Sequence, residues 1–387
     1  MGATMTLSHW AKLALAAPLL LTGCKGFWNA PPASTTTPTT TASSGRFFVL
    51  NAATSQIAGY YVNAGVLTTL PGSPYTLPAT PLALAISPNN GFLYVSTISG
   101  IYLYLIASNG QLTQGNSGNV ISSDQAVSLQ VDATNAWLLD VSSGASQAFA
   151  IPISPTTGLV TQPTEQFVPL PATTLQQVAL SPANTTAFVA MGSGGTAIIP
   201  FNSANTNPFG VVSTVAVKNS AGAALSVATD TSSTLLFIGE TVASSGSNSG
   251  GLRAIDLSTL KELSGSPFAT GGLAPYDILP EKAGTYIYVV NRQVSGSSTG
   301  VIQEYTLSNT GGVYTLTALT QTVSVGTHPV ALAEDNTSTF VFAVDYDGSP
   351  DLMGYTFDST TAGLLDAAIS SATGTDPVQA NAIAALH

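Results

Sequence analysis

The sequence predicts an all-β fold, a seven-bladed β-propeller of four-stranded blades whose ring is closed by the C-terminal strand. Three observations lead to this prediction. A strand-turn-strand unit recurs along the chain, its copies lie about 50 residues apart, and the two ends of the chain hold complementary parts of one unit. Three copies of the unit are "LALAISPNNGFLYVST" (82–97), "QQVALSPANTTAFVA" (176–190) and "VALAEDNTSTFVFAV" (330–344).

Each repeat contains four short strands separated by turn residues. The inner strand ends at a turn such as "SPNN", and a second strand such as "FLYVS" follows. A third strand such as "IYLYLIA" and a fourth after a glycine-containing turn, such as "NGQLTQ", complete the blade. The inner strands are expected to begin, at intervals of 45 to 54 residues, near Leu82, Val127, Gln176, Leu225, Tyr276, Val330 and Val378.

The two ends of the repeat region complete each other. The segments "RFFVLN", "QIAGYYV" and "VLTTLPG" supply strands two to four of a first blade, and the last residues, "PVQANAIAALH", supply an inner strand alone. We expect this C-terminal strand to join the first blade, which would close the ring and remove an exposed sheet edge. A β-sandwich or two smaller β domains are the alternatives, but no change of composition divides residues 46–387.

The composition limits the classes of partner. Charged residues make up 7% of the chain, against roughly 25% in an average soluble protein, and the net charge is −11. Nucleic acid and anionic lipid surfaces require clustered lysine and arginine, so neither is expected as a partner. The 44% of apolar residues is enough for a large core.

The N-terminal region predicts export. Lys12 precedes a nine-residue apolar run at 13–21, which is too short to span a bilayer and typical of a signal peptide. The sole cysteine, Cys24, ends the sequence "LTGC", which resembles the lipobox of bacterial lipoproteins. The alternative is an ordinary secretory signal with an incidental cysteine.

The lipobox resemblance implies a signal peptide at 1–23, an acylated Cys24 and a bacterial cell-envelope location, with the lipid as the only membrane attachment. Lys25 stands where an inner-membrane retention aspartate would otherwise lie, which implies the outer membrane or cell surface. Residues 24–45 are rich in proline, threonine and serine and predict an unfolded tether. The propeller is then expected over residues 46–387.

The turn and strand "SPNNGFLYV" (87–95), the tyrosine of the third strand and the "G-x-L" turn resemble the lactonase-type seven-bladed propellers, which include 6-phosphogluconolactonases, and the YVTN repeats of surface proteins. In the lactonase-type family the junction before an inner strand reads Gly-x-His-Pro-Arg-His, and its basic groups help to hold an anionic sugar lactone. Here "GTHPVA" keeps His328 and Pro329 but has Val330 and Ala331 where the arginine and second histidine would stand.

In a propeller the junctions before the inner strands and the loops between second and third strands share one mouth of the channel. This places five candidate binding residues near that mouth: His328, Asp376, Asp124, Tyr276 and Arg292. The loops at 240–251, 291–300 and 345–351 are enlarged, either for function or as neutral insertions.

The last of these loops, "DYDGSPD", holds Asp345, Asp347 and Asp351 around Gly348. Carboxylates on a flexible loop suit calcium, so the loop is a candidate calcium site; a solvated acidic loop is the alternative. No other cofactor is expected.

The residues required by the commoner hydrolases are missing from the sequence. A serine triad needs a positioned histidine and a zinc site needs several histidine or cysteine ligands, whereas His328 stands alone and suits a hydrogen-bonded loop position. We therefore predict a binding or scaffolding module for a protein or glycan partner in the cell envelope. Hydrolysis of sugar lactones and a purely structural envelope role are the alternatives.

Overall fold

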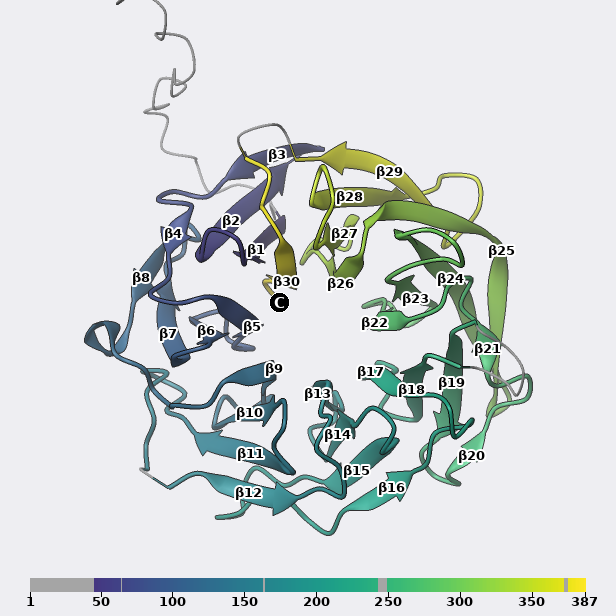
Figure 1. Ribbon diagram of the computed structural model, residues 1–387, viewed down its shortest axis with the longest axis horizontal. Coiled ribbons are helices and arrows are strands. Elements are labelled where there is room, and N and C mark those ends of the chain that lie inside the picture. Colours follow the sequence, from purple (N-terminus) through teal and green to yellow (C-terminus); the bar gives the residue numbers. More distant parts are fainter. Residues whose placement is uncertain (1–44, 64, 163, 243–248, 372–374) are drawn as a thin grey trace, which may run out of the picture. The chain divides into compact units, whose positions relative to one another are not determined.

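The computed structural model describes residues 45–63, 65–162, 164–242, 249–371 and 375–387. Seven antiparallel sheets surround a central axis, and the C-terminal strand lies beside the first strand of the propeller (Figure 1). The seven-bladed prediction is therefore confirmed. The predicted signal peptide, Cys24 and the predicted tether lie outside the described residues, apart from Gly45, which begins β1. Within those residues, we find no helix of the length and apolar character needed to cross a membrane.

Blades 1 to 4 run from β1 to β16, and the C-terminal β30 belongs to blade 1. Blade 1 consists of β30 (Ala380–Ala385), β1 (Gly45–Asn51), β2 (Gln56–Asn63) and β3 (Val66–Thr69), with β4 (Tyr75–Thr76) also paired to β2. Blade 2 consists of β5 (Pro81–Ile86), β6 (Phe92–Thr97), β7 (Gly100–Ile106) and β8 (Leu112–Gln114), followed by a 3₁₀ turn at Asn116–Gly118. Blade 3 consists of β9 (Ala126–Val131), β10 (Trp137–Ser142), β11 (Gln147–Pro152) and β12 (Gln166–Pro169). Blade 4 consists of β13 (Gln177–Leu180), β14 (Thr186–Ala190), β15 (Thr196–Pro200) and β16 (Ser213–Val215).

Blades 5 to 7 complete the ring. Blade 5 consists of β17 (Ala224–Thr229), β18 (Leu235–Glu240), β19 (Gly251–Asp256), β20 (Lys261–Glu262) and β21 (Phe268–Ala269). Blade 6 consists of β22 (Pro275–Pro280), β23 (Tyr286–Asn291), β24 (Thr299–Thr310) and β25 (Val313–Thr327). Blade 7 consists of β26 (Pro329–Glu334), β27 (Phe340–Asp345), β28 (Leu352–Phe357) and β29 (Leu365–Ser370). Every inner strand begins within two residues of its predicted start.

The repeated turn has a local cause. In blade 3 the buried Asp132 accepts hydrogen bonds from the backbone N–H groups of Ala136 and Trp137, both at 2.7 Å. The turn from Asp132 to Ala136 contains one residue with a positive φ, Asn135 at +57°. Asparagine tolerates this left-handed conformation. Asp230 and Asp335 make the same contacts in blades 5 and 7. The repeat in the sequence is thus a side-chain cap that starts the second strand of a blade.

The core lies between the faces of neighbouring blades. Between blades 7 and 1 the rings of Phe342 and Phe47 stack, and Val49 and Ile383 join the same cluster. Strand β30 pairs antiparallel with β1, with Val49 opposite Ile383. Because β30 follows blade 7 in the chain and belongs to the sheet of blade 1, the ring is closed by backbone hydrogen bonds as predicted.

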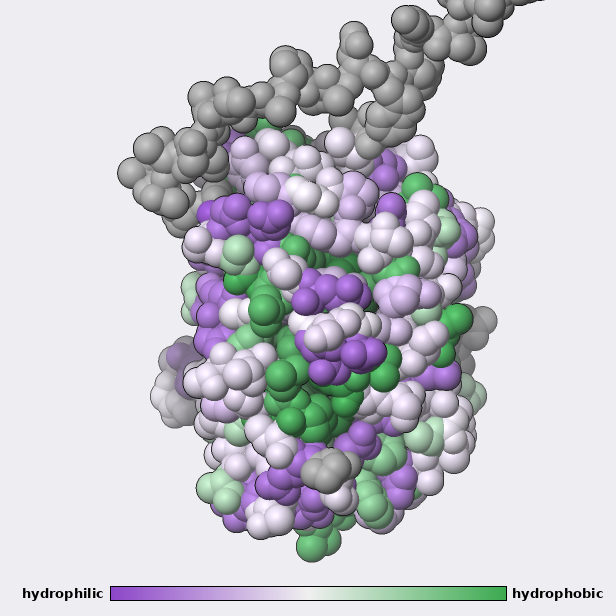
Figure 2. Space-filling view, turned by 90° about the vertical axis from the view of Figure 1, so that its left-hand side faces the viewer, coloured by the Kyte–Doolittle hydropathy of each residue, from purple (hydrophilic) through white to green (hydrophobic). Residues whose placement is uncertain are grey.

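The outside of the ring is only partly polar. On the side that includes β4 and β8, apolar residues form a band between hydrophilic ones (Figure 2). Blades 2 and 3 and their connections expose Leu105, Val120 and Leu159. With so few charged residues, hydroxyl and amide side chains make up much of the remaining surface.

Candidate binding site at the channel mouth

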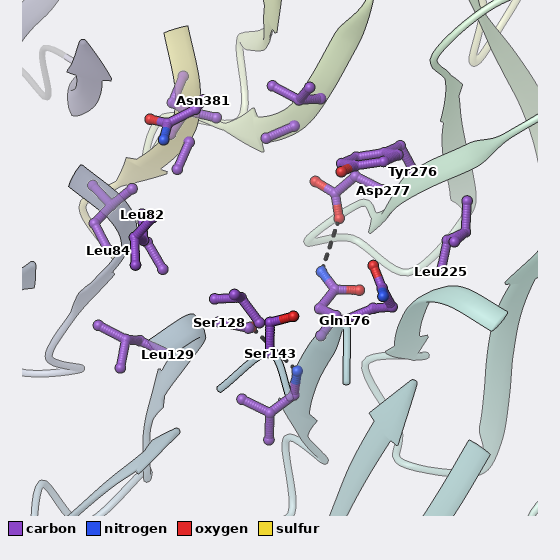
Figure 3. Close-up of a pocket in the computed structure, with 18 of the residues that line it drawn as sticks. Leu82, Leu84, Ser128, Leu129, Ser143, Gln176, Leu225, Tyr276, Asp277 and Asn381 are labelled. Atoms are coloured by element: carbon purple, nitrogen blue, oxygen red, sulfur yellow. Dashed lines mark hydrogen bonds between the residues drawn. The ribbon is translucent and has the colours of Figure 1, made fainter. Parts of the chain in front are cut away.

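A cavity of about 450 Å³ occupies the central channel. Its wall comes from the inner strands and from loops next to them. Leu82 and Leu225 are among its apolar residues, and Ser128, Gln176 and Asn381 are among its polar ones (Figure 3). Such a mixture of aliphatic, amide and hydroxyl groups in a preformed concave site suits a small polar ligand.

Side chains tie each inner strand to the next. Ser128 of β9 accepts a hydrogen bond from the backbone of Val178 in β13 at 3.1 Å, and Asn381 of β30 donates to the carbonyl of Pro81 in β5 at 2.8 Å. Among the described residues, five of the seven neighbouring pairs of inner strands are joined in this way; the other three contacts are Gln177 to Val227, Ser226 to Pro275 and Asp277 to Leu332. The cavity wall is therefore fixed by hydrogen bonds across the blades.

Asp277 of β22 is the acidic side chain that lines this cavity. Its Oδ1 accepts from the Gln177 side chain at 3.2 Å (Figure 3, dashed line) and from the Ile278 N–H at 2.9 Å. Its Oδ2 accepts from the Leu332 N–H at 2.9 Å. Burial raises the pKa of Asp277 to about 6, against the opposing effect of these hydrogen bonds. The carboxylate is thus largely ionised at neutral pH and already occupied by three donors.

Arg292 is the basic side chain of the cavity lining. The carbon at the centre of its guanidinium group lies 5.1 Å from the ring centroid of Tyr276 and 6.0 Å from that of Tyr346. All three residues line the cavity. Cation–π contacts of this kind hold a guanidinium in place without using its N–H donors. Within the described part of the chain the guanidinium has no ion pair or hydrogen bond, so its donors can reach a ligand.

His328 lies at the junction before β26, and its ring faces the loop that follows β27. Its Nδ1 lies 2.8 Å from Oδ2 of Asp347, which is exposed. The backbone of His328 has a φ of +55° and bonds to Tyr346 and Ser298. His328 is not among the residues that line the cavity. Its ring is therefore paired with an acidic side chain of the same blade, outside the cavity.

Asp345, Asp351 and Asp376 form a second acidic group beside the last junction of the chain. Asp345 accepts from the Gly326 N–H at 3.2 Å, Asp351 accepts from the Gln379 N–H at 2.7 Å, and Asp376 accepts from the Asp351 N–H at 3.0 Å. Asp345 is fully buried and Asp351 is 4% exposed, so the alternative of a solvated acidic loop holds only for Asp347. Burial and neighbouring carboxylates raise the pKa of Asp345 to about 7 and that of Asp351 to about 6.

The calcium site stays a prediction. The Asp347 carboxylate pairs with His328 and does not lie with those of Asp345 and Asp351 in one group of ligands. Across the described ranges, no three histidine, cysteine or acidic side chains come together as metal ligands would. Asp345 and Asp351 each have one buried oxygen without a hydrogen-bond partner among the described residues.

Asp124 lies outside the cavity lining, at the junction between blades 2 and 3. The Ser122 hydroxyl lies 2.6 Å from Asp124 Oδ2 and 3.0 Å from Glu165 Oε1. Asp140 of β10 is fully buried, and its burial together with Asp124 and Glu165 raises its pKa well above the ordinary range. Of the five predicted mouth residues, Tyr276 and Arg292 line the cavity, whereas His328, Asp124 and Asp376 do not.

Sequence reasoning did not single out Gln177, Asp277, Tyr346 or Asn381 as cavity residues. A signal for Asp277 was present, because a carboxylate inside the apolar inner strand "PYDILP" must find donors or be neutralised. No comparable signal marks the other three, since their positions follow from the way the blades meet.

No family model and no curated protein matches the sequence. A candidate 6-phosphogluconolactonase from Bacteroides fragilis is similar in structure, with a TM-score of 0.69, 13% identity, and coverage of 90% of this chain and all of that one. A second candidate 6-phosphogluconolactonase, from Bacteroides uniformis, has a TM-score of 0.68 at 14% identity over 89% of this chain and all of that one. The periplasmic gluconolactonase of Pseudomonas aeruginosa has a TM-score of 0.65 at 13% identity over 89% of this chain and 99% of that one.

The chain has the seven-bladed propeller fold of lactonase-like proteins. At these identities the likeness shows the fold, and the fold hosts many activities.

Proposed function

We propose that this propeller is a lipid-anchored envelope protein whose channel cavity binds a polyhydroxylated ligand of glycan type. The observation that carries the proposal is the Arg292 guanidinium, held by the rings of Tyr276 and Tyr346 beside the cavity, with no acceptor among the residues that the structure describes. A sugar offers both an apolar face for an aromatic ring and oxygen atoms for a guanidinium. Gln176 and Asn381 add amide groups to the same wall.

The lipid anchor in this proposal rests on the sequence at 13–24. The partner is a glycan rather than a large protein face because the polar groups converge inside a concave site. Asp277 sets a limit on the ligand, since a carboxylate in the wall disfavours a strongly anionic group placed next to it.

Binding can be measured by saturation-transfer NMR with gluconate, glucuronate, N-acetylglucosamine and glucono-δ-lactone as probes. We expect at least one probe to give a saturable signal that is lost in Arg292→Ala and weakened in Tyr276→Ala. Arg46→Ala is the matched control, because Arg46 bonds to the Ser108 carbonyl away from the cavity. No saturable signal with any probe, or equal loss in Arg46→Ala, would contradict the proposal.

Lactone hydrolysis is the second candidate function. It is favoured by the structural likeness to a gluconolactonase and by a cavity carboxylate with a pKa of about 6, which could accept a proton from water at neutral pH. The three donors already on Asp277 occupy its oxygens, so a water molecule must compete with them to reach the carboxylate. Turnover of 6-phosphogluconolactone or glucono-δ-lactone that is lost in Asp277→Asn or His328→Ala would favour this function over simple binding.

A further inference from the structure

The outer strand of blade 6 is unlike the outer strands of the other blades. Strand β25 has 15 residues, whereas the outer strands of the other six blades have two to six. Figure 1 shows it as a long ribbon on the rim of the ring. Short outer strands are one of the ways in which proteins prevent edge-to-edge pairing, and blade 6 lacks this protection.

The sequence of β25 also lacks the residues that usually protect an edge. "VYTLTALTQTVSVGT" (313–327) contains no charged residue and no proline, and threonine and valine, which favour strands, make up much of it. By contrast, the outer strands of blades 5 and 7 carry Lys261, Glu262 and Asp366. Nothing in the strand opposes the approach of another strand.

The part of β25 that is open to pairing is Val313–Ala318, here called the β25 edge. Beyond it a bulge interrupts the ladder with β24, and the Leu319 carbonyl accepts a hydrogen bond from the Gln303 side chain. Further on, the Tyr355 hydroxyl of blade 7 bonds to the Ser324 carbonyl. Among the described residues, no strand pairs with the outer side of the β25 edge.

The turn that precedes the β25 edge determines which of its backbone groups face outward. Gly311 and Gly312 have φ of +61° and +87°, as in a two-residue type I′ hairpin. Thr310 and Val313, which flank the turn, then form a hydrogen-bonded pair, and such pairs alternate along the ladder. The N–H and C=O groups of Tyr314, Leu316 and Ala318 therefore point away from β24.

The β25 edge is fixed by contacts with blade 5. Leu316 is buried in the cluster formed with blade 5, and the Tyr314 hydroxyl lies 3.0 Å from the Thr234 hydroxyl of that blade. Thr315 and Thr317 face the opposite way and are exposed. A rigid edge loses little conformational entropy when another strand pairs with it.

We propose that the β25 edge pairs antiparallel with the same edge of a second copy of this chain. The three outward-facing residues are placed symmetrically about Leu316, so an antiparallel pairing centred there sets Tyr314 opposite Ala318 and Leu316 opposite its counterpart. Each of the three pairs exchanges two bonds, or about six in total. The net charge of −11 works against association elsewhere on the surface, and this uncharged strand brings no acidic side chains together.

Disulfide trapping tests the pairing and its register. In the proposed dimer Thr315 faces Thr317 of the other copy at about 4.5 Å between Cα atoms, within disulfide range. Thr315 and its own counterpart are about 7–8 Å apart, beyond that range. The full chain carrying Cys24→Ser serves as the background, so that an introduced cysteine is the only thiol.

We expect an equimolar mixture of Thr315→Cys and Thr317→Cys chains to form a cross-linked dimer, at least about tenfold more than either variant alone. Circular dichroism of each variant checks that the fold is kept. Equal cross-linking by the single variants would overturn the proposed register. No cross-linking in the mixture, together with a single monomeric species in sedimentation velocity of the unaltered chain, would overturn the proposal.

A proline at Ala318 provides a second, independent test. The Ala318 N–H points outward, so Ala318→Pro removes a donor from the edge without breaking a bond to β24. We expect this variant to weaken dimerisation about tenfold or more, because both copies lose a bond. Ala318→Thr keeps the N–H and is the matched control. Equal dimerisation of the two variants would contradict pairing through this edge.

Discussion

Phe47 of β1 stacks on Phe342 of β27 with ring centroids 4.2 Å apart, although nearly 300 residues separate them in the chain. Both side chains are fully buried. The contact joins the first described strand to the last complete blade, on the face beside the closing strand β30. Closure of the ring therefore depends on a packed interface as well as on the β1–β30 hydrogen bonds.

Loss of the C-terminal strand is expected to prevent stable folding. Deletion of residues 378–387 removes β30 and leaves β1 with an open edge and an uncovered face. We expect the shortened chain to lack a cooperative thermal transition in circular dichroism. Removal of His387 alone is the control and should keep the transition. A deletion variant as stable as the parent would show that closure is not needed.

Truncation of the stacked ring should be costly. Phe342→Ala leaves a cavity between blades 7 and 1 and is expected to lower the free energy of unfolding by about 3–5 kcal/mol. Denaturant unfolding of Phe47→Ala, Phe342→Ala and the double variant measures the coupling, expected at about 0.5–1.5 kcal/mol for the ring pair. Additive effects of the two substitutions would mean that the rings do not act together.

The buried acids predict that stability falls as pH rises through neutrality. The folded state raises the pKa of Asp345 to about 7 and of Asp351 to about 6, above the ordinary value of an unfolded aspartate. The folded state then binds more protons than the unfolded state between about pH 4 and 7, so stability is lost across that window. Asp345→Asn should flatten this dependence and raise stability at pH 8 by an amount on the order of 1–2 kcal/mol.

Gln111→Asn is the control for this prediction, because Gln111 is exposed and neither glutamine nor asparagine titrates. It should leave the slope between pH 4 and 7 unchanged. The same melting curves with EDTA separate protonation from calcium binding. Protonation predicts no change in Tm on chelation, whereas a drop that added calcium restores would support the calcium site instead.

The sequence at 21–24 predicts acylation of Cys24. Cys24→Ser should move the protein from the detergent phase to the aqueous phase in a phase-partition experiment and abolish incorporation of labelled palmitate. Lys25→Asp serves as a control for sorting, since it should keep the lipid but change the membrane in a host with two membranes. Continued detergent partitioning of Cys24→Ser would argue against a lipid anchor.

The fold could be predicted because its signals are local. The Asp132 and Asp230 caps lie two blades apart, and the turns at Asn90, Asn135 and Asn184 lie one blade apart. Each cap or turn forms from residues within six positions of one another. Ring closure could also be predicted, because the incomplete repeats at the two chain ends add up to one blade.

The site could be predicted only in part because its contacts are not local. The bond between Gln177 and Asp277 spans 100 residues, and Arg292 meets Tyr346 across two blades. Knowing which loops share a mouth led to Arg292 and Tyr276, which line the cavity. It did not show that the Asp376 carboxylate accepts a hydrogen bond from the Asp351 N–H. The direction in which each of these side chains points depends on packing between blades, which the spacing of the repeats does not predict.

The position of β1 in its sheet has a mechanical consequence. It lies between β2 and β30, with an antiparallel ladder on each side. A pull on the chain at Gly45, directed along the strand, would shear both ladders at once and could not unzip them bond by bond. A propeller pulled at Gly45 would therefore resist tension at the blade that contains both β1 and β30.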